Sequence, residues 1–188
     1  MNRKRSVIGL VVFLIFFALA GISQRVTNGT PSETKQEVRG EAESLVAVTR
    51  VIDGDTIVVN IDGKDETVRL IGIDTPEIVH GNKKTECFGQ EAKKKAEEIL
   101  SGKRVRLEDD ESQSNRDKYS RLLRYVFLED GTLFNKWIIT EGFAFEYTYQ
   151  IPYRYQEEFK KAQMQAREES KGLWAQDACG RENNRLDN

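Results

Sequence analysis

The chain has 188 residues, enough for one domain with additional segments. Its formal net charge of −2 argues against a protein that holds nucleic acid by bulk electrostatics alone, because such proteins are basic. The chain has a single histidine, His80, which lies in a polar stretch. A mechanism that needs two histidines is therefore excluded, and a Ser-His-Asp relay has at most one candidate. Carboxylates and arginines are left to carry any catalysis.

The N-terminus has the anatomy of an export signal. Arg3-Lys4-Arg5 precedes an apolar run from Val7 to Ala20, which ends in the small residues of a cleavage site. Residues 1–22 are therefore predicted to be a signal peptide or, if uncleaved, a signal anchor that forms the only membrane contact. The polar residues 23–43 read as a flexible linker. The protein is expected outside the cytoplasm, secreted or tethered.

Residues 44–178 are predicted to form one domain, followed by a tail at 179–188. Alternating apolar residues and Asp-Gly turns predict five strands, at 45–52, 56–61, 66–73, 104–107 and 122–128. Apolar stripes with helical spacing predict three helices, at 89–101, 133–141 and from Tyr155 to near Gly172. Short strands with turns between them suit a small closed barrel, so the predicted fold is α+β with an OB-type five-stranded β-barrel.

Two cysteines are present, Cys87 and Cys179. An even count in an exported protein predicts a disulfide, which would join the C-terminal tail to the start of the helix that begins near Gly89. The alternative is a pair of free thiols. In either case the role would be structural and not catalytic.

Acidic residues gather at two predicted turns. Asp53 and Asp55 flank Gly54, and their carboxylates could converge on one cation, although Asp-Gly alone is above all a turn former. In the second turn, Asp74 offers a carboxylate and Thr75, held extended by the following proline, offers a carbonyl, both suitable ligands for Ca²⁺. Glu77 could take a proton from a water near the metal. The alternative is a proline turn with incidental acids.

Two arginines complete the set. Arg69 lies in an otherwise apolar strand, where a cation needs a partner, and Arg121 begins the fifth strand. Forked guanidinium groups match the oxygens of a phosphodiester under attack. Strict alternation would place Arg69 and Asp74 on opposite faces of the strand, so a bulge at Gly72 is expected to bring them together. On its own, Arg121 could be an ordinary surface residue at a strand end.

Three motifs in this order resemble the staphylococcal nuclease (thermonuclease) family: Val51-Ile52-Asp53-Gly54-Asp55-Thr56, Arg69 to Glu77, and Asp117-Lys118-Tyr119-Ser120-Arg121. Gly142-Phe143-Ala144 with the tyrosines that follow resembles a later segment of that family, and the similarity covers residues 45–174. The resemblance implies an OB-fold barrel with three helices. It also implies a Ca²⁺-dependent nuclease that hydrolyses DNA and RNA and leaves 3′-phosphate ends.

The resemblance also implies roles for individual residues. The metal carboxylates would be Asp55 and Asp74, the carbonyl ligand would be Thr75, and Asp53 would be an acid near the metal. Glu77 would be the general base that activates water. The residues that stabilise the phosphorane-like transition state would be Arg69 and Arg121.

For the nucleic acid, preferentially single-stranded, the resemblance implies contacts from Lys118, Tyr119, Tyr147 and Tyr149, with the tyrosines as stacking faces. Ser120 stands where the family often has glycine. Without Arg3, Lys4 and Arg5 the formal charge falls from −2 to −5, whereas well-known family members are basic. No feature of the sequence calls for a partner chain, so a monomer is expected.

Two other functions remain open. The same barrel could be a non-catalytic module that binds nucleic acid or a protein, as in relatives that have lost their acids. The signal and linker alone would also fit a structural domain tethered in the cell envelope. In this chain every acid and arginine of the set is present, which favours the nuclease.

Overall fold

The computed structural model describes residues 44–78 and 86–179. The predicted signal segment, the linker, His80 and nearly all of the predicted C-terminal tail lie outside these ranges. In the described part of the chain, no helix combines the length and the apolar character needed to cross a bilayer.

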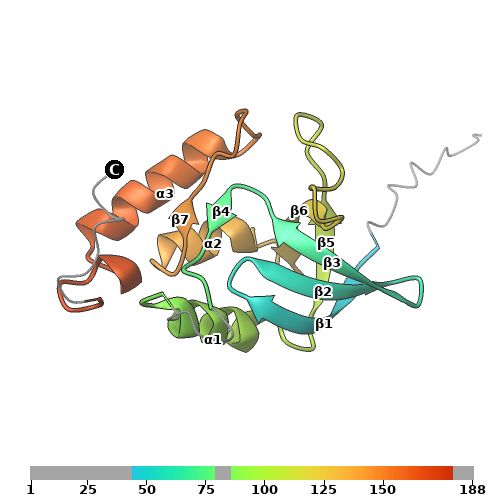
Figure 1. Cartoon of the computed structure of the whole chain (residues 1–188), viewed down its shortest axis with the longest axis horizontal. Coiled ribbons are helices and arrows are strands. Elements are labelled where there is room, and N and C mark those ends of the chain that lie inside the picture. The colour runs from blue at the N-terminus through green and yellow to red at the C-terminus, as the bar shows by residue number, and fades with distance from the viewer. Residues whose placement is uncertain (1–43, 79–85, 180–188) are drawn as a thin grey trace, which may run out of the picture. The chain divides into compact units, whose positions relative to one another are not determined.

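The centre of the domain is a closed five-stranded barrel with the strand order β1-β2-β3-β6-β5 (Figure 1). All neighbouring strands are antiparallel except β3 and β6, which run parallel. This confirms the predicted five-stranded barrel. The strands are β1 (Val46–Asp53), β2 (Thr56–Ile61), β3 (Lys64–Leu70), β5 (Arg104–Glu108) and β6 (Leu122–Leu128).

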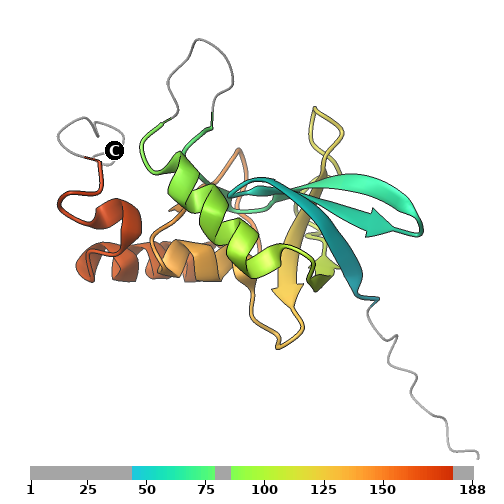
Figure 2. The ribbon, with the colours of Figure 1, turned by 90° about the horizontal axis from the view of Figure 1, so that it is seen from below.

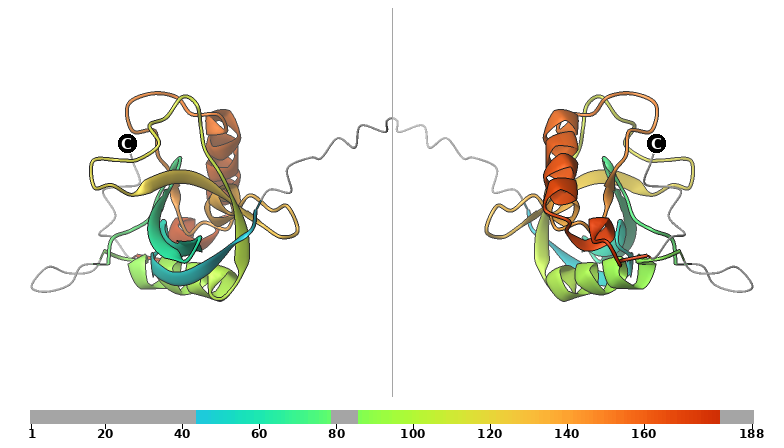
Figure 3. Two further views of the ribbon diagram at one scale, coloured as in Figure 1. Left: turned by 90° about the vertical axis from the view of Figure 1, so that its right-hand side faces the viewer. Right: turned by 90° about the vertical axis from the view of Figure 1, so that its left-hand side faces the viewer.

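Three helices accompany the barrel, as predicted: α1 (Gly89–Leu100), α2 (Phe134–Thr140) and α3 (Gln156–Glu168). The helix α2 lies between α3 and the barrel, and α1 runs beneath β1 (Figures 1 and 2). In both views of Figure 3, α1 lies across the bottom of the barrel and α3 stands upright beside it. A short 3₁₀ helix, Gly172–Trp174, then returns to the core, where Leu173 is buried.

The end of the third strand differs from the prediction. The strand β3 stops at Leu70, and a turn at Ile71–Gly72 leads into a separate two-residue strand, β4 (Ile73–Asp74), which pairs with β7 (Phe145–Glu146). Gly72 adopts a φ of 77°, and a Cβ atom there would lie 2.5 Å from the ring of Tyr153. The expected bulge is therefore a turn that only glycine can make against this ring.

Asn135 fixes that turn from the side of α2. Its side chain is fully buried; the amide oxygen accepts a hydrogen bond from Val126 N–H at 2.9 Å, and the amide nitrogen donates to the Ile71 carbonyl at 2.9 Å. A buried amide with both ends paired ties two segments together at little desolvation cost. The turn is thus attached to both β6 and α2.

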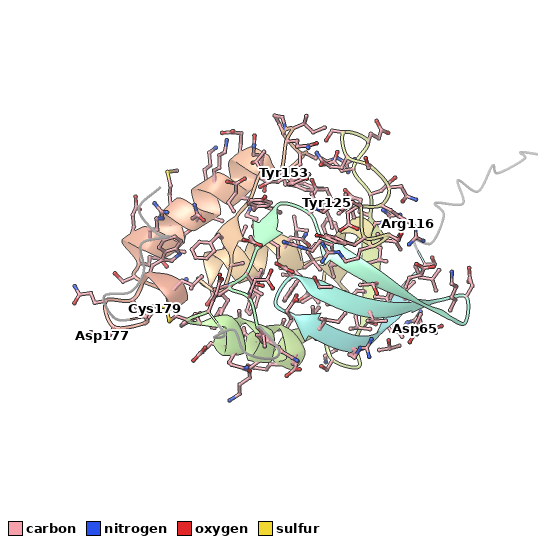
Figure 4. The ribbon with its side chains drawn as sticks, viewed as in Figure 1. Asp65, Arg116, Tyr125, Tyr153, Asp177 and Cys179 are labelled. Atoms are coloured by element: carbon pink, nitrogen blue, oxygen red, sulfur yellow. A yellow bond between two sulfur atoms is a disulfide. The ribbon has the colours of Figure 1, made fainter. Side chains whose placement is uncertain are left out.

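Cys87 and Cys179 form a disulfide, with 5.6 Å between their Cα atoms, as predicted. The bridge joins the residues just before α1 to the end of the described chain, 92 positions later. Figure 4 labels Cys179 near the start of α1. The chain after α3 is therefore covalently attached to the segment that leads into α1.

Candidate active site

A cleft of about 580 Å³ opens where the turn after β3 meets the loop before β6 and the segment that follows β7. Glu77 lines it together with residues from all three of these segments. The predicted site residues that line the cleft are Arg69, Asp74, Glu77, Lys118, Tyr119, Arg121, Tyr147 and Tyr149. Residues assigned from separate motifs thus share one surface.

Arg69 joins the two predicted metal carboxylates. Its Nη2 atom lies 3.0 Å from Asp55 Oδ2 and 3.1 Å from Asp74 Oδ1. Its Nη1 atom donates to the Ile73 carbonyl at 2.8 Å. The turn at Gly72 makes this possible, because it brings β4 back within reach of the arginine side chain. Two carboxylates that are 19 positions apart in sequence therefore converge on one cationic nitrogen.

Asp55 is buried behind the cleft, with 4% of its surface exposed. Its Oδ2 atom accepts a hydrogen bond from Thr75 N–H at 3.0 Å, and its Oδ1 atom accepts one from the Thr56 hydroxyl at 2.9 Å. Thr75 is also buried and packs against Gly54, where a Cβ atom would lie 2.6 Å from the threonine methyl. The turn between β1 and β2 therefore needs glycine so that Thr75 can approach Asp55 closely.

Asp53 shares the turn with Asp55. Its Oδ1 atom accepts a hydrogen bond from Asp55 N–H at 3.2 Å. Burial and, after it, the negative charge of Asp55 raise the pKa of Asp53 to about 7. The turn therefore holds Asp53 in a setting that disfavours its charged form.

Arg121 is held by Asp117, a residue of the third motif to which the sequence analysis gave no role. Arg121 Nε donates to Asp117 Oδ2 at 2.7 Å, and the backbone N–H of Arg121 donates to Asp117 Oδ1 at 3.0 Å. Burial alone would raise the pKa of Asp117, but these hydrogen bonds outweigh it and hold the pKa below its ordinary value. An acid four positions before the arginine was the signal available in the sequence.

Thr56 connects this arginine to the acids. Arg121 Nη1 lies 3.5 Å from the Thr56 hydroxyl, which in turn donates to Asp55. Both predicted catalytic arginines and both predicted metal carboxylates thus belong to one connected network. Between Asp117 and Arg121, Ser120 adopts a φ of 66°, a left-handed conformation that explains why glycine suits this position.

Glu77 is exposed and follows Pro76 in a segment without helix or strand. Its backbone N–H donates to Glu86 Oε2 at 3.1 Å, and its carbonyl accepts from Glu86 N–H at 3.0 Å. Glu86 was not among the residues predicted to form the site. No pattern in the sequence signals it, because its carboxylate contacts the backbone of a residue nine positions earlier.

The predicted nucleotide-binding tyrosines are exposed at the rim of the cleft. The exposed fractions are 67% for Tyr119, 44% for Tyr147 and 61% for Tyr149. The ring centroids of Tyr147 and Tyr149 lie 6.4 Å apart, and Lys118 Nζ lies 5.0 Å from the Tyr119 ring. Exposed rings beside a cation offer stacking surfaces and positive charge to a single nucleic-acid strand.

Among the described residues, no group of three or more histidine, cysteine or acidic side chains is placed to hold a metal ion. What the structure does bring together is a smaller set: the carboxylates of Asp55 and Asp74, which meet at Arg69, and Thr75, whose N–H donates to Asp55. Such oxygen ligands suit a hard cation that keeps several waters. The predicted Ca²⁺ ligand set stays a prediction.

The chain is similar to known proteins over most of its length. The model of the family described as "Staphylococcal nuclease homologue" matches residues 67–176. The thermonuclease of Staphylococcus hyicus is 36% identical over 172 residues, which cover 92% of this chain and 99% of the relative. The thermonuclease of Staphylococcus intermedius is 38% identical over 164 residues, 87% of this chain and 90% of the relative. Endonuclease YncB of Bacillus subtilis is 35% identical over 150 residues, 78% of this chain and 67% of the relative.

Proposed function

The chain belongs to the staphylococcal nuclease family, and we propose on that basis that it is a Ca²⁺-dependent nuclease that hydrolyses DNA and RNA to 3′-phosphate ends. One observation carries the proposal: a single network joins Arg69, Asp74 and Arg121, which line the cleft, to the buried Asp55 and Thr56. The stability of a barrel alone would not require two arginines and two acids to meet at one place.

The residues that would hold the metal are Asp55 and Asp74, through their carboxylates, and Thr75, through its carbonyl. The arrangement fits a cation, because the two carboxylates already converge on one positive nitrogen. Bound Ca²⁺ would supply positive charge to a phosphoryl oxygen and to a nearby water.

In the proposed reaction Glu77 accepts a proton from the water that attacks phosphorus. The bond from phosphorus to the 5′ oxygen breaks, and this oxygen takes a proton from solvent, which leaves a 3′-phosphate and a 5′-hydroxyl. Arg69 and Arg121 stabilise the charge that develops on the phosphoryl oxygens. Asp117 fixes the guanidinium of Arg121 through Nε, so little reorganisation is needed when the charge appears.

The substrate is proposed to be preferentially single-stranded. Bases of a single strand are free to stack on exposed rings, whereas bases in a duplex are already stacked on one another. The rings of Tyr119, Tyr147 and Tyr149 at the rim, with the cation of Lys118, support this preference. The protein is proposed to act as a monomer.

The protein is proposed to work outside the cytoplasm. The disulfide between Cys87 and Cys179 supports this, because disulfides persist in oxidising compartments. The sequence pattern of residues 1–22 supports export as well. Mass measurement of the protein recovered from the culture medium and from membranes would distinguish a cleaved signal from a retained anchor.

The deciding experiment is to incubate the purified protein with denatured DNA and with RNA in the presence of Ca²⁺, and then to repeat it with an excess of chelator. Cleavage that the chelator abolishes, with fragment ends that a 3′-phosphatase can dephosphorylate, is expected. Absence of cleavage in any divalent cation would leave the alternative, a non-catalytic binding module that uses the exposed tyrosines and Lys118.

A further inference from the structure

Glu86 hydrogen-bonds to both the N–H and the carbonyl of Glu77. Glu86 accepts a hydrogen bond from the Glu77 N–H through its carboxylate at 3.1 Å and donates its own N–H to the Glu77 carbonyl at 3.0 Å. The first of these is charge-assisted and so stronger than a bond between neutral groups. Because the N–H and the carbonyl lie on either side of the Glu77 Cα atom, fixing both fixes the direction in which the side chain leaves the backbone.

Glu86 is in turn held by its neighbours. The next residue, Cys87, is bonded to Cys179, and the Glu86 carbonyl accepts a hydrogen bond from Gly89 N–H at 3.1 Å. Phe88, with a φ of 70°, packs its ring 5.4 Å from that of Phe143. Figure 2 shows α1 from the side, with the segment that leads into its first turn. The segment before α1 is thus anchored to two distant parts of the chain.

The start of α1 also packs against the backbone of Glu77. A Cβ atom at Gly89 would lie 3.0 Å from the Pro76 carbonyl oxygen and 3.1 Å from the Glu77 carbonyl oxygen. Glycine is therefore the residue that lets the helix approach the Glu77 peptide this closely. Glu86 and Gly89 therefore both lie against the two peptide groups on either side of the Glu77 Cα atom.

From this geometry we infer that Glu86 is a positioning residue for Glu77 and that the Cys87–Cys179 disulfide holds Glu86 in place, so that full turnover requires the oxidised protein. The inference rests on the proposed role of Glu77 as general base. A dithiol reductant would cleave the S–S bond to two cysteine thiols and would itself become a disulfide. The segment of Glu86 would then lose its covalent anchor and keep only the contacts of Gly89 and Phe88, while the arginines, Asp55 and Asp74 keep all of theirs.

Glu86→Ala is expected to lower kcat by about 10- to 100-fold, the range in which a displacement of about 1 Å reduces catalysis, with KM unchanged. KM should not move because the proposed substrate contacts come from other segments. Glu86→Gln keeps an oxygen that can accept the Glu77 N–H and should recover most of kcat. Glu91→Ala removes another exposed carboxylate, in the first turn of α1, and should match the wild type.

The double substitution Cys87→Ser with Cys179→Ser tests the anchor. Measured where circular dichroism shows the variant folded, its kcat should fall in the direction of Glu86→Ala, and dithiothreitol should lower kcat of the wild type but not of this variant. An unchanged kcat in Glu86→Ala would overturn the positioning role, and an unchanged kcat in the double variant would overturn the role of the disulfide.

A measurement independent of activity separates this inference from the proposed function. Amide hydrogen exchange at Glu77, followed by NMR without substrate or metal, should be about tenfold faster in Glu86→Ala than in the wild type and close to wild type in Glu86→Gln. Equal exchange in all three would refute the link between the residues. If exchange responds but wild-type protein never cleaves nucleic acid, the proposed function fails instead.

Discussion

Two buried carboxylate sites in this domain are built in opposite ways. Asp110, before the loop that lines one side of the cleft, is 5% exposed and is surrounded by donors. Its Oδ2 atom accepts from the Tyr125 hydroxyl at 2.6 Å and from Arg154 N–H at 2.8 Å, and its Oδ1 atom accepts from the N–H and hydroxyl of Ser112. Burial raises the pKa of Asp110, but these bonds outweigh it, and the pKa lies below its ordinary value.

The turn that carries Asp53 and Asp55 is different. Asp55 has donors from Thr75, Thr56 and Arg69, whereas burial and, after it, the negative charge of Asp55 raise the pKa of Asp53 to about 7. A carboxylate with a full set of donors is a structural element. Carboxylates whose charge is left partly unneutralised raise the energy of the folded chain, and such sites are typical of binding or catalysis.

If this contrast is correct, the largest effect on activity should come from the cleft and should not involve stability. Glu77→Gln removes the proposed base while keeping the shape of the side chain, and turnover should fall by roughly 10²–10⁴-fold. Because Glu77 is exposed, the free energy of unfolding should hardly change. Cleavage rates and thermal melts of the variant check both points, with Glu91→Gln as the control; wild-type turnover would refute the assigned role.

Arg121→Ala should lower kcat by roughly 10²–10³-fold, as expected when one group that stabilises transition-state charge is removed. Arg104→Ala removes an exposed arginine from β5 and should leave kcat unchanged, so the two variants separate a local role from an effect of net charge. Equal, small losses in both would show that Arg121 acts only as part of the general positive charge.

The sequence predicted the barrel and the three helices because alternation, Asp-Gly turns and helical spacing are local signals. It did not predict that β3 ends at Leu70. The left-handed turn at Gly72 depends on the ring of Tyr153, which arrives from a segment some eighty positions later. A contact between segments so far apart has no counterpart in local periodicity.

In the site, too, local motifs could be predicted and contacts between distant segments could not. Motifs indicated the acids and arginines, and the structure brings them into one network, although their roles stay predictions. The residues that were missed, Asp117 and Glu86, act on backbone groups or on another side chain and not on the cleft itself. The role of Glu86 depends on where α1 begins relative to Glu77, and only tertiary structure determines that.

On the structural side of the comparison, Asp110→Asn should lower the free energy of unfolding by about 1.5–3 kcal/mol, the usual range for hydrogen bonds to a charged group. An asparagine has one acceptor oxygen, so its amide nitrogen would face the donors of either Ser112 or Arg154 and Tyr125. Asp109→Asn alters the exposed neighbour and is the matched control.

The direction of the Asp110 pKa shift also sets how the loss of unfolding free energy in Asp110→Asn depends on pH. The pKa of Asp110 is lower in the folded chain than its unfolded value of about 3.9, so its contribution is complete above that value and is lost as pH falls through the folded pKa. Urea unfolding of the wild type and of Asp110→Asn should therefore give curves that converge in acid. A gap that stays constant down to pH 2 would show that the charge of Asp110 does not stabilise the fold.

Asp53→Asn should have the smallest effect and the opposite sign: in the presence of chelator it should raise the free energy of unfolding by about 0.5–2 kcal/mol. The folded pKa of about 7 lies above the unfolded value of about 3.9, so the wild type loses stability as pH rises between them, and the variant does not. The gain should thus grow from pH 4 to pH 7, the reverse of the trend at Asp110. A variant less stable than the wild type across this range would mean that Asp53 stabilises the turn, and the contrast between the two sites would not hold.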